Sequence, residues 1–182
     1  MKSSRFYLAT AAAVALMSVL PAAQVPAALQ AKIDAEIVSL RQLASDPAIV
    51  SAVKARNAQA GADVDAMTQE KWAAAGAHDP LMHALTTNAA AAVLKARLSA
   101  AASEVFLNAA DGRKVALLSK TTSWSHKGSP KHDVPMTGGA WQGPAEMDQS
   151  SGVESIQVAV PVLDAGKPIG SIVVGLDIAK LK

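Results

Sequence analysis

The chain has 182 residues, no cysteine and a formal net charge of +2. The lack of cysteine excludes disulfides, thiolate metal sites and cysteine nucleophiles. A charge so close to balance also lacks the strongly basic character of nucleic-acid-binding proteins, so we expect no nucleic-acid partner.

The N-terminal segment has the pattern of a secretory signal peptide. Lys2 and Arg5 precede an uncharged apolar run from Phe6 to Leu20, and small residues follow it. The run is shorter than the roughly 20 apolar residues of a membrane span, although an uncleaved membrane anchor is the alternative. We therefore divide the chain into a signal peptide, residues 1–27, and a periplasmic domain, residues 28–182.

Residues 28–103 are predicted to be the helical part of this domain. Apolar residues at helical spacing predict a first helix that ends near Ser45: Leu29, Ile33, Ile37 and Leu40. Two Asp-Pro pairs, at 46–47 and 79–80, are typical of an N-cap followed by proline at the first helical position. They predict helices over 47–57 and 80–101, and a short helix is expected over 68–75, after a loop.

Residues 104–182 are predicted to be the sheet part. Asp111-Gly112 indicates a hairpin between strands at 105–108 and 115–118, and a second hairpin joins strands at 153–162 and 169–178. Alternation predicts that Ile156, Val158, Val160 and Val162 share one face. The segment 120–147 has few aliphatic residues and is interpreted as one long loop. The result is an α+β fold, an antiparallel sheet with an N-terminal helical layer on one side.

Two segments of the sheet part resemble Cache domains, the PDC or PAS-like sensor domains. The run 105–112 (VFLNAADG) is similar to the first hairpin of that family. Residues 158–164 with 166–177 are similar to the closing hairpin, in which a strand ending in proline and an aliphatic residue is followed by a turn and x-Pro-Ile-Gly. The resemblance implies a single periplasmic Cache-like sensor domain. Because the chain ends at Lys182, soon after the last predicted strand, we expect a free-standing domain that signals through a partner, such as a membrane sensor or transporter.

The long loop is the predicted ligand site, because in the resembled fold it closes a small pocket over the sheet. Between Lys120 and His132 it has three lysines, two histidines and no acidic residue. A buried lysine favours an anionic ligand, and tryptophan offers an apolar wall with an N–H donor. The candidate ligand-binding residues are Trp124, His126, Lys131, His132 and Trp141. The alternative is a solvated basic loop whose tryptophans pack on the sheet.

Other chemistry is less well supported by the sequence. His126 and His132 with Asp133 match no defined metal site, and the neighbouring lysines would repel a cation, so we expect no metal and no cofactor. No nucleophile elbow, phosphate loop or zinc-protease motif occurs, and we expect no enzyme activity. Glu146 and Asp148 are interpreted as a solvated acidic corner rather than a catalytic pair.

These observations favour an exported sensory module that binds a small organic anion such as a carboxylate. Amino-acid recognition is not expected, because the family members that bind amino acids use tyrosine and arginine among other residues. The mature chain has no tyrosine, and no arginine follows Arg113. The alternative function is a ligand-free structural or adaptor protein that forms a homodimer through its N-terminal helix.

Overall fold

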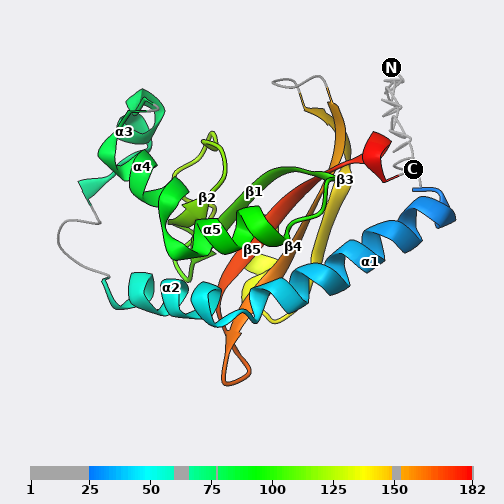
Figure 1. Ribbon diagram of the computed structural model, residues 1–182, viewed down its shortest axis with the longest axis horizontal. Helices are drawn as coiled ribbons and strands as arrows, with labels where there is room; N and C mark the ends of the chain where they lie inside the picture. The colour runs from blue at the N-terminus through cyan, green and yellow to red at the C-terminus, as the bar shows by residue number, and fades with distance from the viewer. Residues whose placement is uncertain (1–24, 60–65, 77, 149–152, 182) are drawn as a thin grey trace, which may run out of the picture.

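The computed structural model describes residues 25–59, 66–76, 78–148 and 153–181 (Figure 1). The predicted signal peptide therefore lies almost entirely outside the described residues, and no helix in the described ranges is long and apolar enough to cross a membrane. The helices are α1 (Ala27–Ala44), α2 (Pro47–Ala58), α3 (Gln69–Ala74), α4 (Pro80–Thr87), α5 (Ala89–Arg97) and α6 (Pro130–Met136). The strands are β1 (Ala102–Ala109), β2 (Lys114–Leu117), β3 (Trp141–Asp148), β4 (Val153–Asp164) and β5 (Lys167–Asp177), and a 3₁₀ turn, η2 (Ile178–Lys180), follows.

All the strands belong to one antiparallel sheet in the order β2-β1-β5-β4-β3. β5 is the central strand, and the hairpins β1–β2 and β4–β5 are those that the sequence predicted. The prediction of an α+β fold with an antiparallel sheet is thus confirmed. The sheet begins at Ala102, two residues before the boundary expected between the helical and sheet parts.

The predicted helix starts are confirmed at both Asp-Pro pairs. The carboxylate of Asp46 accepts a hydrogen bond from Ala48 N at 2.9 Å, and that of Asp79 accepts one from Leu81 N at 2.8 Å. The single helix predicted over 80–101 is wrong, because Asn88 divides it into α4 and α5. Asn88 leaves the helical conformation, caps α5 by accepting from Ala91 N, and donates to the carbonyl of Val115 on β2 at 2.9 Å.

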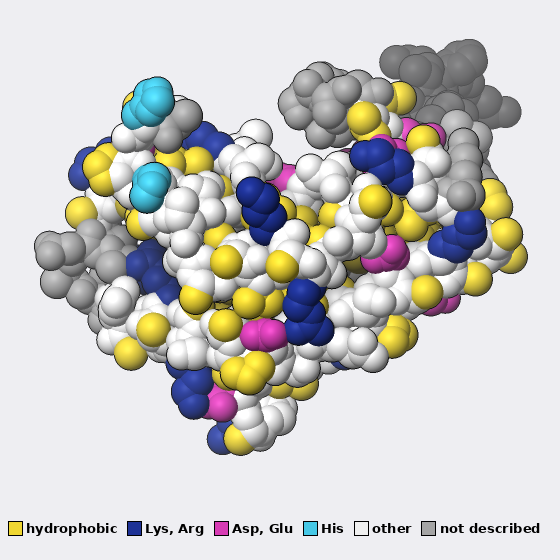
Figure 2. All heavy atoms as spheres, in the orientation of Figure 1, with side chains coloured by type: hydrophobic (Ala, Val, Ile, Leu, Met, Phe, Trp, Pro, Cys, Tyr) yellow, Lys and Arg dark blue, Asp and Glu magenta, His cyan; other side chains and the backbone are white. Residues whose placement is uncertain are grey.

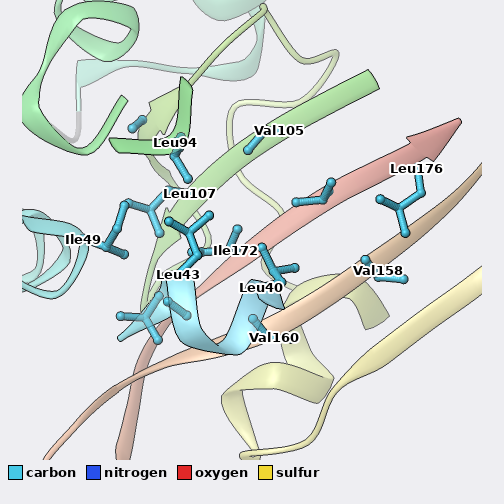
Figure 3. Close-up of a cluster of buried hydrophobic side chains, with 14 of the residues drawn as sticks. Leu40, Leu43, Ile49, Leu94, Val105, Leu107, Val158, Val160, Ile172 and Leu176 are labelled. Atoms are coloured by element: carbon cyan, nitrogen blue, oxygen red, sulfur yellow. The ribbon is translucent and has the colours of Figure 1, made fainter. Parts of the chain in front are cut away.

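One face of the sheet, here called the α1 face, is covered by α1, α2 and α5 (Figures 1 and 3). Aliphatic side chains from the helices meet those of β1, β4 and β5 in a continuous core (Figure 3). The predicted alternation of β4 is confirmed, since Ile156, Val158, Val160 and Val162 all belong to this core. In the stripe of α1, Ile33 and Leu40 are buried, and Leu29 and Ile37 pack against the same core. The apolar stripe of α1 therefore packs against the chain's own sheet.

The opposite face, here called the α6 face, is covered by α3, α4, α6 and the segment 118–129. The expectation that helices lie on one side only is therefore wrong. So is the reading of residues 120–147 as one loop, because α6 and the edge strand β3 form within it. α6 packs against β5, β4 and β3, so this short helix depends on tertiary contacts rather than on its own sequence.

The outer surface of the α1 side carries dispersed charge. Figure 2 shows hydrophobic side chains between the α1–α2 pair and α5, with basic and acidic groups scattered over the surface. Arg97 on α5 pairs with the capping residue Asp46 at 2.8 Å, which links two helices of this layer. Val38 is an exposed aliphatic residue of α1, with 57% of its surface accessible.

Candidate ligand-binding site

The β1–β2 hairpin places two polar side chains under the α6 face. The register between β1 and β2 shifts after Leu107, so that Asn108 pairs with Lys114 and both side chains lie on this face. A register shift of this kind redirects side chains at the end of a hairpin. Both residues are fully buried, with no accessible surface. The shift in register thus brings Lys114 into the interior of the domain.

The hairpin turn also holds the segment that covers the site. Gly112, with φ of +79°, accepts a hydrogen bond from His126 N at 2.9 Å, and Ser125 Oγ donates to the carbonyl of Asp111 at 3.0 Å. A side chain at Gly112 would collide with Lys127 N, which explains why glycine is needed at this close approach. The turn therefore fixes the position of His126.

Helix α3 anchors the same segment from the other side. The indole N–H of Trp72 donates to the carbonyl of Thr121 at 2.8 Å, and Gln69 Oε1 accepts from Trp124 N at 2.9 Å. The rings of Trp72 and Trp124 lie 5.1 Å apart, tilted by 38°. Trp124 is consequently buried, with 4% of its surface accessible.

Helix α6 contributes two basic side chains to this region, Lys131 and His132. His132 is buried and its Nδ1 lies 2.9 Å from Ser171 Oγ of β5, while its Nε2 lies 3.3 Å from the carbonyl oxygen of Ala110. Lys131 is half-buried and donates to Gln157 Oε1 of β4 at 3.0 Å. These two residues thus connect α6 to strands β5 and β4.

Lys114 is the centre of a buried hydrogen-bond network. Its Nζ donates to Asn108 Oδ1 at 2.9 Å and contacts Nδ1 of His126. Asn108 in turn donates from its amide nitrogen to Ser171 Oγ at 3.0 Å, which joins Lys114 to His132. Within the described residues, no carboxylate forms an ion pair with Lys114.

The ring of Phe106 brings three of the basic groups together. His126 stacks on this ring with centroids 4.6 Å apart. Lys114 Nζ lies 4.1 Å from the ring centroid and Lys131 Nζ lies 5.7 Å from it. If both lysines were charged, they would gain some cation–π attraction to this ring, but they would also repel one another.

Burial lowers the pKa values of all four basic groups, and repulsion by neighbouring positive charges adds to this at Lys114, His126 and His132. Burial, and next the positive charge of Lys131, lowers the pKa of Lys114 from 10.5 to about 6. Burial, followed by the neighbouring Lys114, lowers the pKa of His126 to about 3. Burial also lowers the pKa values of Lys131 and His132, although Glu104 and Glu146 oppose the shift at Lys131. At neutral pH the unliganded site therefore contains a largely uncharged Lys114.

The five residues predicted from the sequence occupy this region to different degrees. His126 and His132 take part in the network around Lys114 and Ser171, and Lys131 lies beside it, bonded to Gln157 and near the Phe106 ring. Trp124 packs in the apolar cluster beside Phe106, and Trp141 of β3 is half-buried against the same cluster. The alternative of a solvated loop fits in part, since both tryptophans pack on the sheet and Lys120 and Lys127 are exposed. It does not fit His126 and His132, which are buried.

No group of three or more potential metal ligands occurs in the part of the chain that the structure describes. Asp133 Oδ1 instead accepts a hydrogen bond from Gly128 N at 3.1 Å, while the neighbouring His132 is bonded to Ser171 and Ala110. Glu146 on the edge strand is exposed, in agreement with a solvated position.

The sequence analysis missed Lys114, Asn108, Ser171 and Phe106. A signal was present in the strands, where Asn108 and Ser171 interrupt otherwise apolar runs. A polar residue at an inward position of a strand has to be hydrogen bonded when buried, and such residues therefore indicate a site. Lys114 was hidden because the alternation along β2 is broken by the shift in register.

A groove of about 480 Å³ between α2, α4 and α5 reaches this network from the side. Its lining includes Lys114 and Val115 of β2 together with Arg56 and Asn88. Lys114 lines this groove but has no surface exposed to bulk solvent.

No family profile and no curated protein matches the sequence. Among solved structures, the sensor domain of the Vibrio cholerae histidine kinase DctB is similar with 18% identity and a TM-score of 0.49, over 84% of this chain and 53% of that chain. The Escherichia coli DcuS sensor domain is similar with 12% identity and a TM-score of 0.49, over 85% and 94% of the two chains.

The ligand-binding domain of the Campylobacter jejuni chemoreceptor Tlp3, in complex with 4-methylisoleucine, is 15% identical with a TM-score of 0.42, over 86% of this chain and 62% of that one. This chain thus spans about half of the DctB domain and nearly all of the DcuS domain. At these identities the likeness concerns the fold alone. Two of these structures are described as sensor domains and the third as a ligand-binding domain.

Proposed function

We propose that this chain is a periplasmic sensory domain that binds a small organic anion, such as a carboxylate, between the sheet and α6. Lys114, Lys131 and His126 contact the anion, and Trp124 and Trp141 enclose its carbon skeleton. The domain passes its signal to a membrane partner of the sensor or transporter class. It is proposed to catalyse no reaction.

The observation that carries this proposal is the complete burial of Lys114 without a carboxylate partner among the described residues. Burying a lysine without a counterion is unfavourable, because the charged ammonium loses its hydration. The side chain is then driven towards its uncharged amine form, which costs free energy at neutral pH. The nearby positive charge of Lys131 further disfavours the charged form of Lys114. An anionic ligand would relieve both effects, since a charge-assisted hydrogen bond is about twice as strong as a neutral one.

The proposed anion also suits the remaining groups of the site. Lys131 is half-buried and already directed to the sheet through Gln157, which accepts its hydrogen bond. Gln157 in turn donates to Glu104 Oε2 at 2.8 Å, so the nearby carboxylate is engaged by an amide rather than by Lys114. The amide of Gln157 therefore bridges Lys131 and Glu104 by hydrogen bonds.

Calorimetric titration with acetate, propionate, pyruvate and succinate tests the proposal, using Lys114→Met and Lys127→Met as a matched pair. Both variants remove one lysine charge, but Lys114 is buried and Lys127 is exposed in the covering segment. We expect Lys114→Met to weaken a bound carboxylate about ten- to hundredfold, the loss of one charge-assisted hydrogen bond. Lys127→Met should bind as the unaltered chain does.

The stability of the variants separates binding from folding. Lys114→Met removes an unpaired buried amine, so its unliganded melting temperature should be unchanged or higher. A lysine that served only the fold would give a lower melting temperature and no selective loss of binding. If no carboxylate raises the melting temperature at millimolar concentration, the sensory proposal fails and the adaptor alternative is favoured.

The adaptor alternative has less structural support than the sensory one. Its proposed dimer contact was the apolar stripe of α1, and this stripe is covered by the chain's own sheet. Val38 remains as an exposed aliphatic residue on that helix. Homodimerisation stays a prediction, which light scattering at high micromolar concentration would test.

A further inference from the structure

The indole nitrogen of Trp124 is a buried donor without a hydrogen-bond partner among the described residues. The other tryptophan of the pair differs in this respect, since the indole N–H of Trp72 donates to the carbonyl of Thr121 at 2.8 Å. A buried donor left unsatisfied is unfavourable, and few such groups persist in folded proteins without a reason.

The surroundings of Trp124 hold its ring in a fixed orientation. Trp72 packs against it at 5.1 Å, and the guanidinium carbon of Arg56 lies 5.6 Å from its ring. Its backbone nitrogen is bonded to Gln69, and two residues further along His126 stacks on Phe106. The ring therefore cannot readily turn to find a partner, although it lies in the same apolar cluster as Phe106.

We propose that Trp124 Nε1 is a ligand-binding donor and that the ligand is a carboxylate with an additional acceptor oxygen, a hydroxy acid or a keto acid. This inference rests on the proposed function, in which the carboxylate is bound by Lys114 and Lys131. The second oxygen accepts the indole N–H, while an unsubstituted acid of the same length leaves that donor unsatisfied. Trp124 thus determines which carboxylates are bound.

Matched pairs of acids test the inference by calorimetry on the purified chain. Lactate and pyruvate are compared with propionate, and malate is compared with succinate. We expect the oxygenated acid of at least one pair to bind about tenfold more tightly, because it satisfies a donor that the plain acid leaves buried and unpaired. Trp124→Phe should reduce this preference towards unity, and the ratio of the two affinities is the readout.

Trp72→Phe is the matched control, since it also removes one indole N–H from the same aromatic pair. That N–H is bonded to Thr121, so its loss should lower the melting temperature and leave the preference between acids unchanged. A wild-type chain that binds both acids of each pair equally would overturn the inference and leave the proposed function standing. So would a Trp124→Phe variant that keeps a strong preference. If neither acid of either pair binds, the proposed function fails together with the inference.

A second measurement does not depend on the folding of Trp124→Phe. The chain has three tryptophans, so its nitrogen–proton NMR spectrum contains only three indole signals. Saturation with the oxygenated acid should shift the Trp124 indole proton downfield and slow its exchange with solvent. The plain acid should do neither, and an indole signal that responds identically to both acids would contradict the assigned contact.

Discussion

Proton uptake is the most direct consequence of the buried cluster of basic groups. In the unliganded chain, burial and the nearby Lys131 lower the pKa of Lys114 to about 6. A carboxylate beside Lys114 would favour the ammonium form and move its pKa back towards the ordinary 10.5. Lys114 is then uncharged in the free chain and charged in the complex over a broad range above neutral pH.

The sign and size of the effect follow from this difference. The complex holds more protons than the free chain, so affinity falls as the pH rises between the two pKa values. Between about pH 7 and about pH 8 we expect uptake of about one proton for each anion bound, and about a tenfold loss of affinity per pH unit. Below about pH 6 the affinity should level off, because Lys114 is protonated before the ligand arrives.

Calorimetry in two buffers with different ionisation enthalpies measures the uptake directly. Lys114→Met should abolish both the uptake and the pH dependence, and Lys127→Met should retain both. Lys131→Met should move the dependence to higher pH, because the positive charge of Lys131 contributes to the low pKa of Lys114. A carboxylate that binds with constant affinity and without proton exchange across this range would refute the reasoning.

Three further predictions concern stability, local geometry and export. The free energy of unfolding of the unliganded chain should rise with pH by up to about 1.4 kcal/mol per unit between about pH 6 and pH 10. The reason is that the pKa of Lys114 in the folded chain lies below its value in the unfolded chain. Thermal melting at a series of pH values should show this rise in the unaltered chain and not in Lys114→Met. Gly112→Ala should destabilise the chain more than Gly128→Ala, since both glycines have positive φ but only the first lies against Lys127 N, and denaturant titration compares them. Mass spectrometry of periplasmic material should give an N-terminus between Ala22 and Gln30, whereas intact chain retained in the cytoplasm would contradict the predicted signal peptide.

The elements predicted correctly from the sequence are those specified by local chemistry. The caps at Asp46 and Asp79 act on backbone groups two residues away, so the sequence alone indicates where α2 and α4 begin. The alternation in β4 follows from its one well-defined apolar face. Asn88 was not recognised as a break, because its effect depends on Val115, a partner 27 residues further along the chain.

The segment between β2 and β4 shows where sequence patterns become insufficient. β3 contains Gly143 and Pro144 and lies at the edge of the sheet, so it has no apolar alternation of its own. α6 begins at Pro130 and is held by its packing on three strands. That packing is tertiary, and the sequence pattern does not reveal it. His126 and His132 were selected by composition, but their partner Lys114 depends on the register of a hairpin.

Neighbouring residues of the central strand β5 face opposite sides of the sheet, so this strand couples the two faces. Ser171 faces the binding network, and the next residue, Ile172, lies in the core beneath the helices of the α1 face. Since consecutive residues of a strand move together, a ligand that displaces Ser171 also displaces Ile172. A substitution such as Ile172→Val would then alter ligand affinity from the far side of the sheet, without touching the ligand.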